Sequence, residues 1–451
     1  MAATSSSQSF SSNGSSHSAK LPPRVVIIGG GFGGLHVAKA LRKVRAQVTI
    51  IDRSNHHLFQ PLLYQVATAG LSPADIASPI RVVMRKNRNA EVLMGNVVDV
   101  DTEGKKVILE TGVVVPYDYL VVATGATHSY FGNPHWEQFA PGLKSIADAT
   151  AIRQKILLAF ETAEIEQDPD RKKALLTMIV VGGGPTGVEM AGSIAEMSRL
   201  ALTGDFKHFD PSRTRILLIE AGQRILAQFP DELAEKAHKE LERLGVEVRT
   251  GSRVEEIDGE GVIVSGERIK AKTVLWAAGV KASPAGEWLK TETDKAGRVI
   301  VNGDMSVKGR REIFVIGDTA TAMDENGKPF PGVAPVAIQQ GKYVGKVLKE
   351  RLSGDNITEP FHYFDKGNLA TIGRAFAILQ FRKFKLAGSL AWLIWIFVHI
   401  MYLVEFRNRV AVFLEWLWAY VTYQRGVRLI VGEEEPRPVY SDPARRTVPI
   451  R

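Results

Sequence analysis

Apolar residues along this chain form short continuous runs that end at glycine or at an acidic residue, with amphipathic stretches between them. The first group has an apolar run at 24–29, helical periodicity over 35–44 and a second apolar run at 47–52. Continuous apolar runs of this length are typical of strands buried on both faces of a parallel sheet. The same order recurs later, at 176–182, 188–200 and 215–220. Two strand–helix–strand units predict an α/β fold with two Rossmann-like, doubly wound domains.

Three further apolar runs enter glycine turns, at 119–125, 274–279 and 312–318. If the last of them returns to the first sheet, the first domain is discontinuous and the second is inserted into it. We therefore expect a first domain of 21–145 together with 295–350, an inserted second domain of 146–294, and a C-terminal region of 351–451.

The first 20 residues are rich in serine and contain neither an apolar core nor an arginine. A secretory signal needs an apolar core, and a transit peptide is rich in arginine. This composition instead predicts a disordered tail over 1–20.

Composition narrows the chemistry in two ways. The formal net charge of +8 favours nucleic acid, an anionic membrane surface or anionic ligands, without choosing among them. The chain has no cysteine, which excludes disulfides, zinc–thiolate sites, cysteine-ligated iron–sulfur clusters and thiol-based catalysis.

The first glycine turn carries the pattern Gly29-x-Gly31-x-x-Gly34 between a predicted strand and a predicted helix. Such a turn lets backbone approach a pyrophosphate, while the helix N-terminus offers unpaired N–H groups to the phosphates. Asp52 ends the next strand, at the usual position for a carboxylate that binds a ribose hydroxyl. A tight turn alone would also need glycines, but the strand, helix and acid in register favour dinucleotide binding.

A second pattern, Gly182-x-Gly184-x-x-Gly187, repeats this arrangement with Glu220 as its acid. The longer offset is explained by a predicted loop insertion at 201–214, although a structural turn with a coincidental glutamate is the alternative. A carboxylate at this strand end repels a 2′-phosphate and so favours NADH over NADPH, a preference that the nearby Arg224 could soften.

Two more carboxylates follow predicted strands or turns. Asp318 could accept a hydrogen bond from a flavin's ribityl chain or merely cap the following helix. Glu189 lies in the first turn of the helix after the second glycine turn, where the helix dipole stabilises its charge. Its functional interpretation is a carboxylate that relays protons beside a redox centre.

Taken together, several stretches resemble the type II NADH dehydrogenases, single-subunit flavoenzymes that pass electrons from NADH to a membrane quinone. They are Asn55-His-His-Leu-Phe-Gln-Pro-Leu-Leu-Tyr-Gln-Val-Ala67, Val122-Ala-Thr-Gly-Ala126, Gly182-Gly-Gly-Pro-Thr-Gly-Val-Glu189, Ile316-Gly-Asp-Thr-Ala320 and Ala334-Pro-Val-Ala-Ile-Gln-Gln-Gly341. The first and last are specific to this family, and the others are shared with many two-nucleotide flavin reductases.

The resemblance implies that the first domain binds FAD and the inserted domain binds NADH. The implied FAD contacts are Gly29, Gly31, Phe32, Gly33, Gly34, Asp52, Thr124, Gly125, Asp318 and Ala337. The implied NADH contacts are Gly182, Gly184, Pro185, Thr186, Gly187, Glu220 and Gly279. Catalytic roles are implied for Glu189 in proton transfer and for Gln339 facing the quinone, although Pro335 replaces a second glutamine found in many members.

The C-terminal region combines a predicted strand at 370–379 with aromatic, apolar segments. No charged residue occurs between Leu386 and Val404, a length close to the roughly 20 residues that span a bilayer. Basic residues flank both ends, so we favour helices of Leu386–Tyr423 that lie in one leaflet over a spanning helix. A homodimer interface is the third interpretation of the same apolar surface.

The sequence thus predicts a non-proton-pumping NADH:quinone oxidoreductase that lies peripherally on the cytoplasmic face of the cell membrane and binds no nucleic acid. Sulfide:quinone oxidoreductases and disulfide reductases need redox cysteines and are excluded. Two alternatives stay open: a flavin-dependent reductase of a small acidic electron carrier, which would not need the apolar C-terminal region, and a nucleotide-sensing interaction protein with slow turnover.

Overall fold

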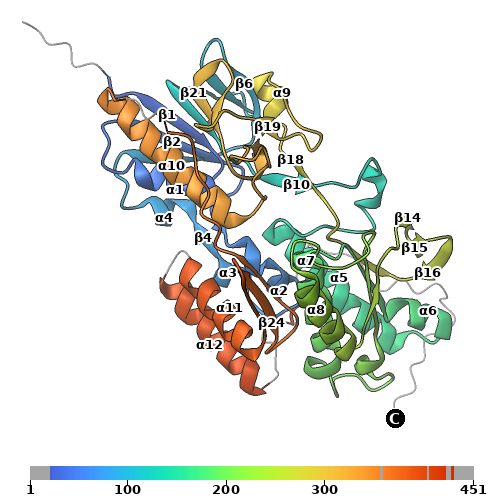
Figure 1. Cartoon of the computed structure of the whole chain (residues 1–451). Helices are drawn as coiled ribbons and strands as arrows, with labels where there is room; N and C mark the ends of the chain where they lie inside the picture. The colour runs from blue at the N-terminus through green and yellow to red at the C-terminus, as the bar shows by residue number, and fades with distance from the viewer. Residues whose placement is uncertain (1–20, 356–358, 404–405, 423–427, 431–451) are drawn as a thin grey trace, which may run out of the picture.

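The computed structural model describes residues 21–355, 359–403, 406–422 and 428–430, and the tail predicted at 1–20 lies outside this part. The first unit is a six-stranded sheet with the order β20-β21-β9-β1-β2-β5. Figure 1 labels β1, β2 and β21 of this sheet. Its strands are β1 (Arg24–Ile28), β2 (Gln47–Asp52), β5 (Ala90–Met94), β9 (Tyr119–Val122), β20 (Ser306–Val307) and β21 (Arg310–Val315). The central strand β1 is buried from Val25 to Ile28, as its continuous apolar run requires.

The chain leaves this sheet after β9 and returns to it with β21. Strand β21 pairs in parallel with β9, and Ile313 lies opposite Leu120. The strands of the second unit come between them in the sequence. This order confirms the prediction that one Rossmann-like unit is inserted into the other.

Helices α1 (Phe32–Ala40) and α10 (Ala334–Ser353) pack closely against each other. Their backbones can approach closely because residue 341 is glycine. A Cβ atom at this position would lie only 2.3 Å from the carbonyl oxygen of Gly33. Helix α1 begins before residue 35, the predicted start, because it starts within the glycine turn itself. It also ends before residue 44, the predicted end. The remaining elements of this part are β3 (His56–Leu58), α2 (Leu63–Ala67), α3 (Pro73–Ile76), β4 (Ala77–Pro79), α4 (Ile80–Met84), β6 (Val97–Asp101), β7 (Lys106–Leu109) and β8 (Val114–Pro116).

The second unit is a four-stranded parallel sheet with the order β13-β12-β11-β17. Its strands are β11 (Thr177–Val181), β12 (Arg215–Ile219), β13 (Val246–Arg249) and β17 (Thr273–Trp276), accompanied by helices α5 (Ile146–Ile165), α6 (Pro169–Leu175), α7 (Pro185–Glu196) and α8 (Asp231–Arg243). A π-helical turn at Met197–Ala201 extends α7, and the predicted insertion at 201–214 is irregular apart from a short 3-10 turn.

Smaller sheets complete and connect the two units. An antiparallel meander, β14 (Val254–Asp258), β15 (Gly261–Val264) and β16 (Glu267–Lys270), adjoins the second sheet. The segments that connect the two units pair with each other as the antiparallel strands β10 (Ala126–His128) and β18 (Val280–Ala282). The chain then returns to the first unit through α9 (Ala285–Leu289), β19 (Val299–Ile300) and β22 (Ala320–Thr321).

The C-terminal region differs from the prediction at two points. The prediction of a single strand over 370–379 is wrong, because the chain turns within this range between β23 (Asn368–Thr371) and β24 (Ala377–Phe381). Strand β25 (Phe384–Gly388) adds a third antiparallel strand, so the helical region predicted to begin at Leu386 begins at Ser389 instead. Glycine at position 373, with φ +63°, allows the first of these turns.

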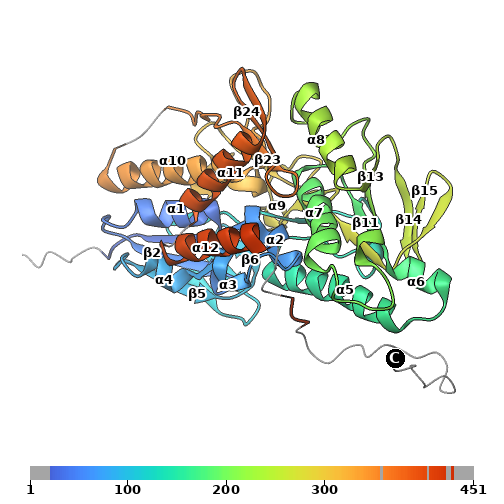
Figure 2. The same cartoon turned by 90° about the horizontal axis from the view of Figure 1, so that it is seen from below.

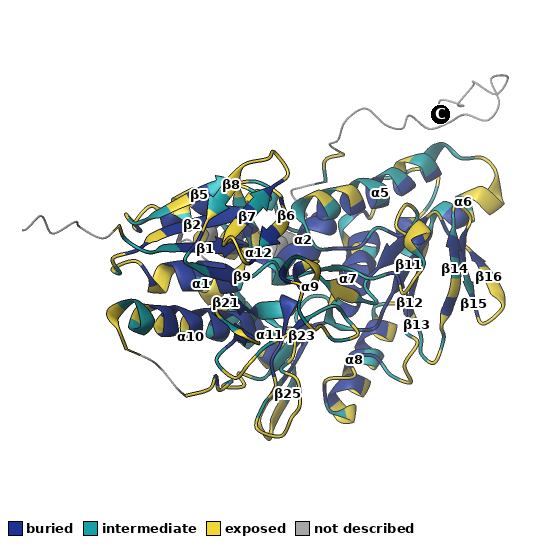
Figure 3. Ribbon diagram, turned by 90° about the horizontal axis from the view of Figure 1, so that it is seen from above, coloured by how far each residue is buried: buried dark blue, intermediate teal, exposed yellow. Residues whose placement is uncertain are grey.

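Helices α11 (Ser389–Tyr402) and α12 (Phe406–Thr422) lie side by side (Figures 1 and 2). In α11, Ala391 and Trp395 are buried, while Leu390, Leu393, Phe397 and Met401 form an exposed apolar stripe. Among the helices of the described residues, none has the length and apolar character that a membrane crossing requires. Figure 3 shows the contrast between the dark blue strands of the two large sheets and the exposed outer surfaces.

Candidate active site

The first glycine turn joins β1 to α1 at the carboxyl edge of the six-stranded sheet. Gly29 has φ +104°, and a Cβ atom there would lie 2.3 Å from the carbonyl oxygen of Ala123. A Cβ atom on Gly34 would lie 1.9 Å from the carbonyl oxygen of Gly29, whereas one on Gly31 would meet no atom within 4 Å. Strand and helix therefore pack only if the outer positions are glycine, and the middle glycine leaves open space in which a phosphate can approach the helix N-terminus.

Asp52 fixes this turn from the neighbouring strand. Its carboxylate accepts the backbone N–H of Gly30 at 2.6 Å and that of Ser54 at 2.7 Å. Asp52 also lines a cleft of about 380 Å³ that runs along the turn. A carboxylate has about four acceptor positions, so two remain for the hydroxyl groups of a ribose in the cleft.

The second glycine turn, between β11 and α7, repeats this geometry. Gly182 has φ +111°, and a Cβ atom on Gly187 would lie 1.8 Å from the carbonyl oxygen of Gly182. The middle glycine, Gly184, again has open space around its Cβ position, and Pro185 begins the helix. Glu220 accepts the backbone N–H groups of Gly183 and Gly222, each at 2.6 Å. The longer sequence offset of Glu220 therefore does not prevent it from occupying the position that Asp52 has in the first unit.

A cavity of about 180 Å³ lies beside Glu220. Its walls include the aromatic side chains of Phe131, Trp136 and Trp276, and also Arg253. Arg224, which the sequence placed near this carboxylate, instead donates to the carbonyl oxygens of Phe229 and Ala227 and does not line the cavity. Arg253 is the one cation among the residues that line this cavity.

Gly279, predicted beside the nicotinamide, lies under an aromatic ring. A Cβ atom on Gly279 would be 2.5 Å from the Cζ atom of Phe131. Phe131 itself has a left-handed backbone, with φ +50°, and its side chain is largely exposed. The missing side chain at position 279 therefore makes room for the Phe131 ring in this structure.

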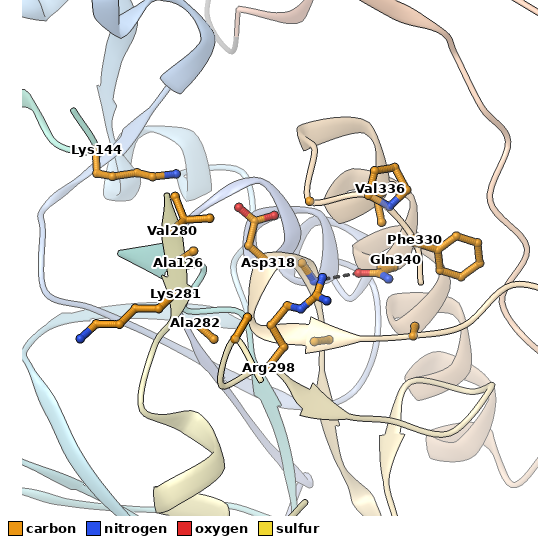
Figure 4. A pocket seen from close by; sticks show the side chains of 16 residues that line it. Ala126, Lys144, Val280, Lys281, Ala282, Arg298, Asp318, Phe330, Val336 and Gln340 are labelled. Atoms are coloured by element: carbon orange, nitrogen blue, oxygen red, sulfur yellow. Dashed lines mark hydrogen bonds between the residues drawn. The ribbon is translucent and has the colours of Figure 1, made fainter. Parts of the chain in front are cut away.

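The cleft of about 380 Å³ at the first glycine turn is called the first cleft below. Another cavity, of about 340 Å³, continues from it toward α10 (Figure 4). The two spaces share five residues, namely Ala126, Lys144, Gly317, Asp318 and Gly332. Thr186, from the second glycine turn, also lines the first cleft. A long dinucleotide can therefore extend from Asp52 past Asp318, and its far end lies next to the second unit.

Thr124 and Gly125 form part of the wall of the first cleft. The Oγ1 atom of Thr124 is 2.5 Å from Ser283 Oγ and 3.2 Å from Thr319 Oγ1. Thr319 in turn donates to the carbonyl oxygen of Gly125 at 2.9 Å. These hydroxyl groups join three segments that are distant in the sequence, which fixes the shape of the cleft.

Two family models match the chain. The model described as pyridine nucleotide-disulphide oxidoreductase covers residues 23–341, and the NDH2 C-terminal domain covers 366–422. The chain is 44% identical over 430 residues to the type II NADH:quinone oxidoreductase Ndh of Mycobacterium tuberculosis, with 92% of each chain covered. It is 31% identical to the internal alternative NAD(P)H-ubiquinone oxidoreductase A1 of Arabidopsis thaliana, with 88% of this chain and 84% of the relative covered.

The chain belongs to the type II NADH dehydrogenase family.

The fold agrees with this family. The structure of NDH2 from Plasmodium falciparum in complex with NADH superposes with a TM-score of 0.83 at 21% identity, covering 91% of this chain and all of that chain. The sulfide:quinone oxidoreductase of Aquifex aeolicus shares the fold with a TM-score of 0.67 at 17% identity. Each unit has one glycine with open space at its Cβ position, Gly31 or Gly184, and one carboxylate that holds the glycine turn, and this arrangement fits FAD in the first unit and NADH in the second.

The start of α10 shows where the family motif at 334–341 places its glutamines. Ala337 lines the first cleft, and Gln340 is buried with its Oε1 atom accepting the N–H of Gly317 at 2.7 Å. Gln339, which the sequence placed toward the quinone, uses both ends of its amide on the backbone of Phe364, at 2.9 and 3.0 Å. Gln339 lines none of the four described cavities, so its role toward quinone stays a prediction.

Glu189 lies in a different cavity, of about 100 Å³, between α7 and the C-terminal helices. The surrounding side chains include Trp392, Trp395 and Trp416. Burial raises the pKa of Glu189 to about 8, against a smaller lowering by a hydrogen bond with the backbone of Thr371. The carboxyl group is therefore mostly protonated at neutral pH. The structure does not bring Glu189 and Gln339 together.

The sequence did not single out His57, although it lies in the family-specific stretch at 55–67. Its buried ring donates from Nδ1 to the carbonyl oxygen of Gly30 at 3.1 Å. The rings of His57 and Phe32 are nearly perpendicular, with their centroids 5.1 Å apart. Burial lowers the pKa of His57 to about 4, so the ring is neutral and supports the first glycine turn without adding charge. Lys144 was also missed, because a lone lysine before a helix carries no distinguishing pattern.

Proposed function

We propose that this chain oxidises NADH through bound FAD and passes two electrons to a membrane quinone without pumping protons. When bound, FAD supplies the redox chemistry, accepting a hydride and releasing electrons. The protein's part is to hold both dinucleotides so that their reactive ends meet, and to supply protons to the quinone.

The observation that carries this proposal is the meeting of the two units at one cleft. The first glycine turn and Asp52 hold one end of the space, and Thr186 of the second glycine turn lines the same space. A dinucleotide held on the second turn can therefore approach the contents of the first cleft directly. Direct hydride transfer needs such contact, since the reacting atoms must come within about 3–3.5 Å.

Glu189 supports the quinone half of the proposal. Reduction of a quinone by two electrons consumes two protons, and a carboxyl group with a pKa of about 8 holds a proton at neutral pH. Its cavity is lined by tryptophans of α11 and α12, the helices whose other sides are exposed and apolar. We infer that the quinone reaches the protein from this side.

The exposed apolar stripe of α11 supports attachment to one leaflet of the membrane. Leu390, Leu393 and Phe397 are each more than half exposed, and Phe413 and Leu414 extend the surface on α12. Lys366, Arg382 and Lys385 come from the adjoining strands and loop and can meet lipid phosphates. We infer peripheral attachment on the cytoplasmic face of the cell membrane, where NADH is available.

Product analysis tests the proposed reaction. Purified holoprotein is incubated anaerobically with NADH and a soluble quinone, and the quinol formed is counted against the NADH consumed. The proposal requires one quinol per NADH, and much slower turnover with NADPH because of Glu220. Reduction of a small acidic carrier protein in preference to quinone would contradict it, as would turnover with NADPH alone. In proteoliposomes, turnover should generate no membrane potential.

A further inference from the structure

Lys144 is held at the junction of the two connected cavities by the start of helix α5. Ser145 is the N-cap of this helix, and its side chain and that of Asp148 form a capping box. The backbone N–H of Lys144 donates to the same Asp148 carboxylate at 3.0 Å. Position 144 is therefore fixed relative to the cleft by hydrogen bonds of its backbone and of the next residue, and its side chain is free to serve what fills the cleft.

The side chain of Lys144 lines both the first cleft and the cavity that continues from it. Figure 4 shows its ammonium group and the carboxylate of Asp318 pointing toward one another across this space. Within the part of the chain that the structure describes, Lys144 forms no ion pair with Asp318 or any other carboxylate. Burial lowers the pKa of Lys144, and the charge of Asp318 acts in the opposite direction.

The other cations at this cavity are arranged differently. Arg298 is paired with Asp294, at 2.7 Å between Nη2 and Oδ2. The amine of Lys281 is exposed and points away from the cavity in Figure 4. Lys144 is partly buried, and a partly buried ammonium group without a paired carboxylate is stabilised by a ligand that supplies negative charge. Lys144 therefore offers a positive charge, not paired with a carboxylate, at the junction of the two cavities.

We propose that Lys144 is the cation that stabilises the reduced form of the flavin and so raises its reduction potential. A hydride from NADH brings two electrons and one proton, so the bound flavin gains one negative charge while NADH leaves as NAD⁺. The ammonium of Lys144, partly buried at the junction of the two cavities, favours that charged product over the neutral oxidised form. The N-terminus of α10 lines the same space and adds the positive end of its dipole. This inference rests on the proposed function, because it requires FAD in the cleft.

The test is a redox titration of the bound flavin in the wild-type protein and in three variants, each reconstituted with excess FAD. Lys144→Met removes the charge, Lys144→Arg keeps it, and Lys281→Met removes a charge at the rim of the same cavity as a matched control. We expect the Lys144→Met midpoint to fall by about 30 mV, which corresponds to a tenfold change in equilibrium constant for a two-electron couple. The midpoint of Lys144→Arg should stay near the wild-type value, and that of Lys281→Met should shift by less than a third as much.

An unchanged midpoint in Lys144→Met, even with weaker retention of FAD, would show that Lys144 only holds the cofactor and would overturn the proposal. An equal shift in Lys281→Met would overturn it too, because the effect would then be a general one of net charge. Lys144→Gln serves as a second neutral variant if the methionine variant is unstable. Wild-type protein that binds no FAD would instead refute the proposed function itself, so the two failures are distinguishable.

Discussion

Replacing Glu189 by glutamine keeps the size and hydrogen-bonding shape of the side chain but removes its transferable proton. The fold raises the pKa of Glu189 from 4.5 to about 8, chiefly through burial. This shift corresponds to roughly 5 kcal/mol between the protonated and charged forms, at 1.36 kcal/mol per pKa unit. At pH 7 the group is about nine-tenths protonated, and it loses its proton as the pH rises through 8.

Two consequences follow for the Glu189→Gln variant. General acid catalysis contributes typically 10²–10⁴-fold, so the reoxidation of the flavin by quinone should slow by about 10²-fold or more. In the wild-type protein that step should also slow as the pH rises through about 8, and the variant should lack this dependence. Reduction of the flavin by NADH should change little, since this half-reaction takes no proton from the protein.

The same shift predicts a change in stability. Because the folded-state pKa lies above that of the unfolded chain, the folded protein binds more protons between about pH 4.5 and 8. The wild-type free energy of unfolding should therefore fall across this range, and Glu189→Gln should remove part of that decline. Urea unfolding at pH 5 and pH 9 measures this difference in the free energy of unfolding.

Equal rates of flavin reoxidation in the wild-type protein and in Glu189→Gln would refute the reasoning. A pH dependence of this rate near pH 8 that persists in the variant would refute it too.

Three further predictions concern the glycine turns, the nucleotide preference and the membrane surface. Gly34→Ala places a Cβ atom 1.9 Å from a backbone oxygen and should lower both the FAD content and the melting temperature of the FAD-free protein, whereas Gly31→Ala, with open space at its Cβ position, should lower the FAD content and leave the melting temperature of the FAD-free protein unchanged. Glu220→Gln should reduce the preference for NADH over NADPH in kcat/KM about tenfold, because the charge that repels a 2′-phosphate is gone; an unchanged ratio would show that another residue sets it. Phe397→Glu, on the exposed stripe of α11, should reduce co-sedimentation with anionic vesicles at least tenfold while leaving turnover with a soluble quinone intact, and full sedimentation would place the attachment elsewhere.

The two glycine turns could be predicted in detail because their chemistry is local. A strand, three glycines, a helix and an acid within a short stretch determine one geometry, and the structure gives Asp52 and Glu220 the same backbone-holding position. The return of β21 to the first sheet could be inferred only as a possibility, since strand order depends on contacts between residues far apart in the sequence.

Other features depend on packing that the sequence pattern does not encode. The C-terminal hairpin was missed because its turn lies inside an apolar run, where Gly373 was not recognised as a turn position. The family motif identified Gln339, but only the structure shows that its amide is bound to Phe364 while Gln340 lies inward. Lys144 acquires its importance from two cavities that meet beside it, and no sequence pattern announces that meeting.

Double-mixing stopped-flow spectroscopy tests the central claim most directly. Holoprotein is first mixed anaerobically with one equivalent of NADH, then with a soluble quinone, while the flavin absorbance is followed. The account predicts that NADH bleaches the flavin at a rate no slower than steady-state turnover and that quinone restores its absorbance at such a rate. Slow bleaching by NADH, or a reduced flavin that quinone leaves bleached, would contradict it.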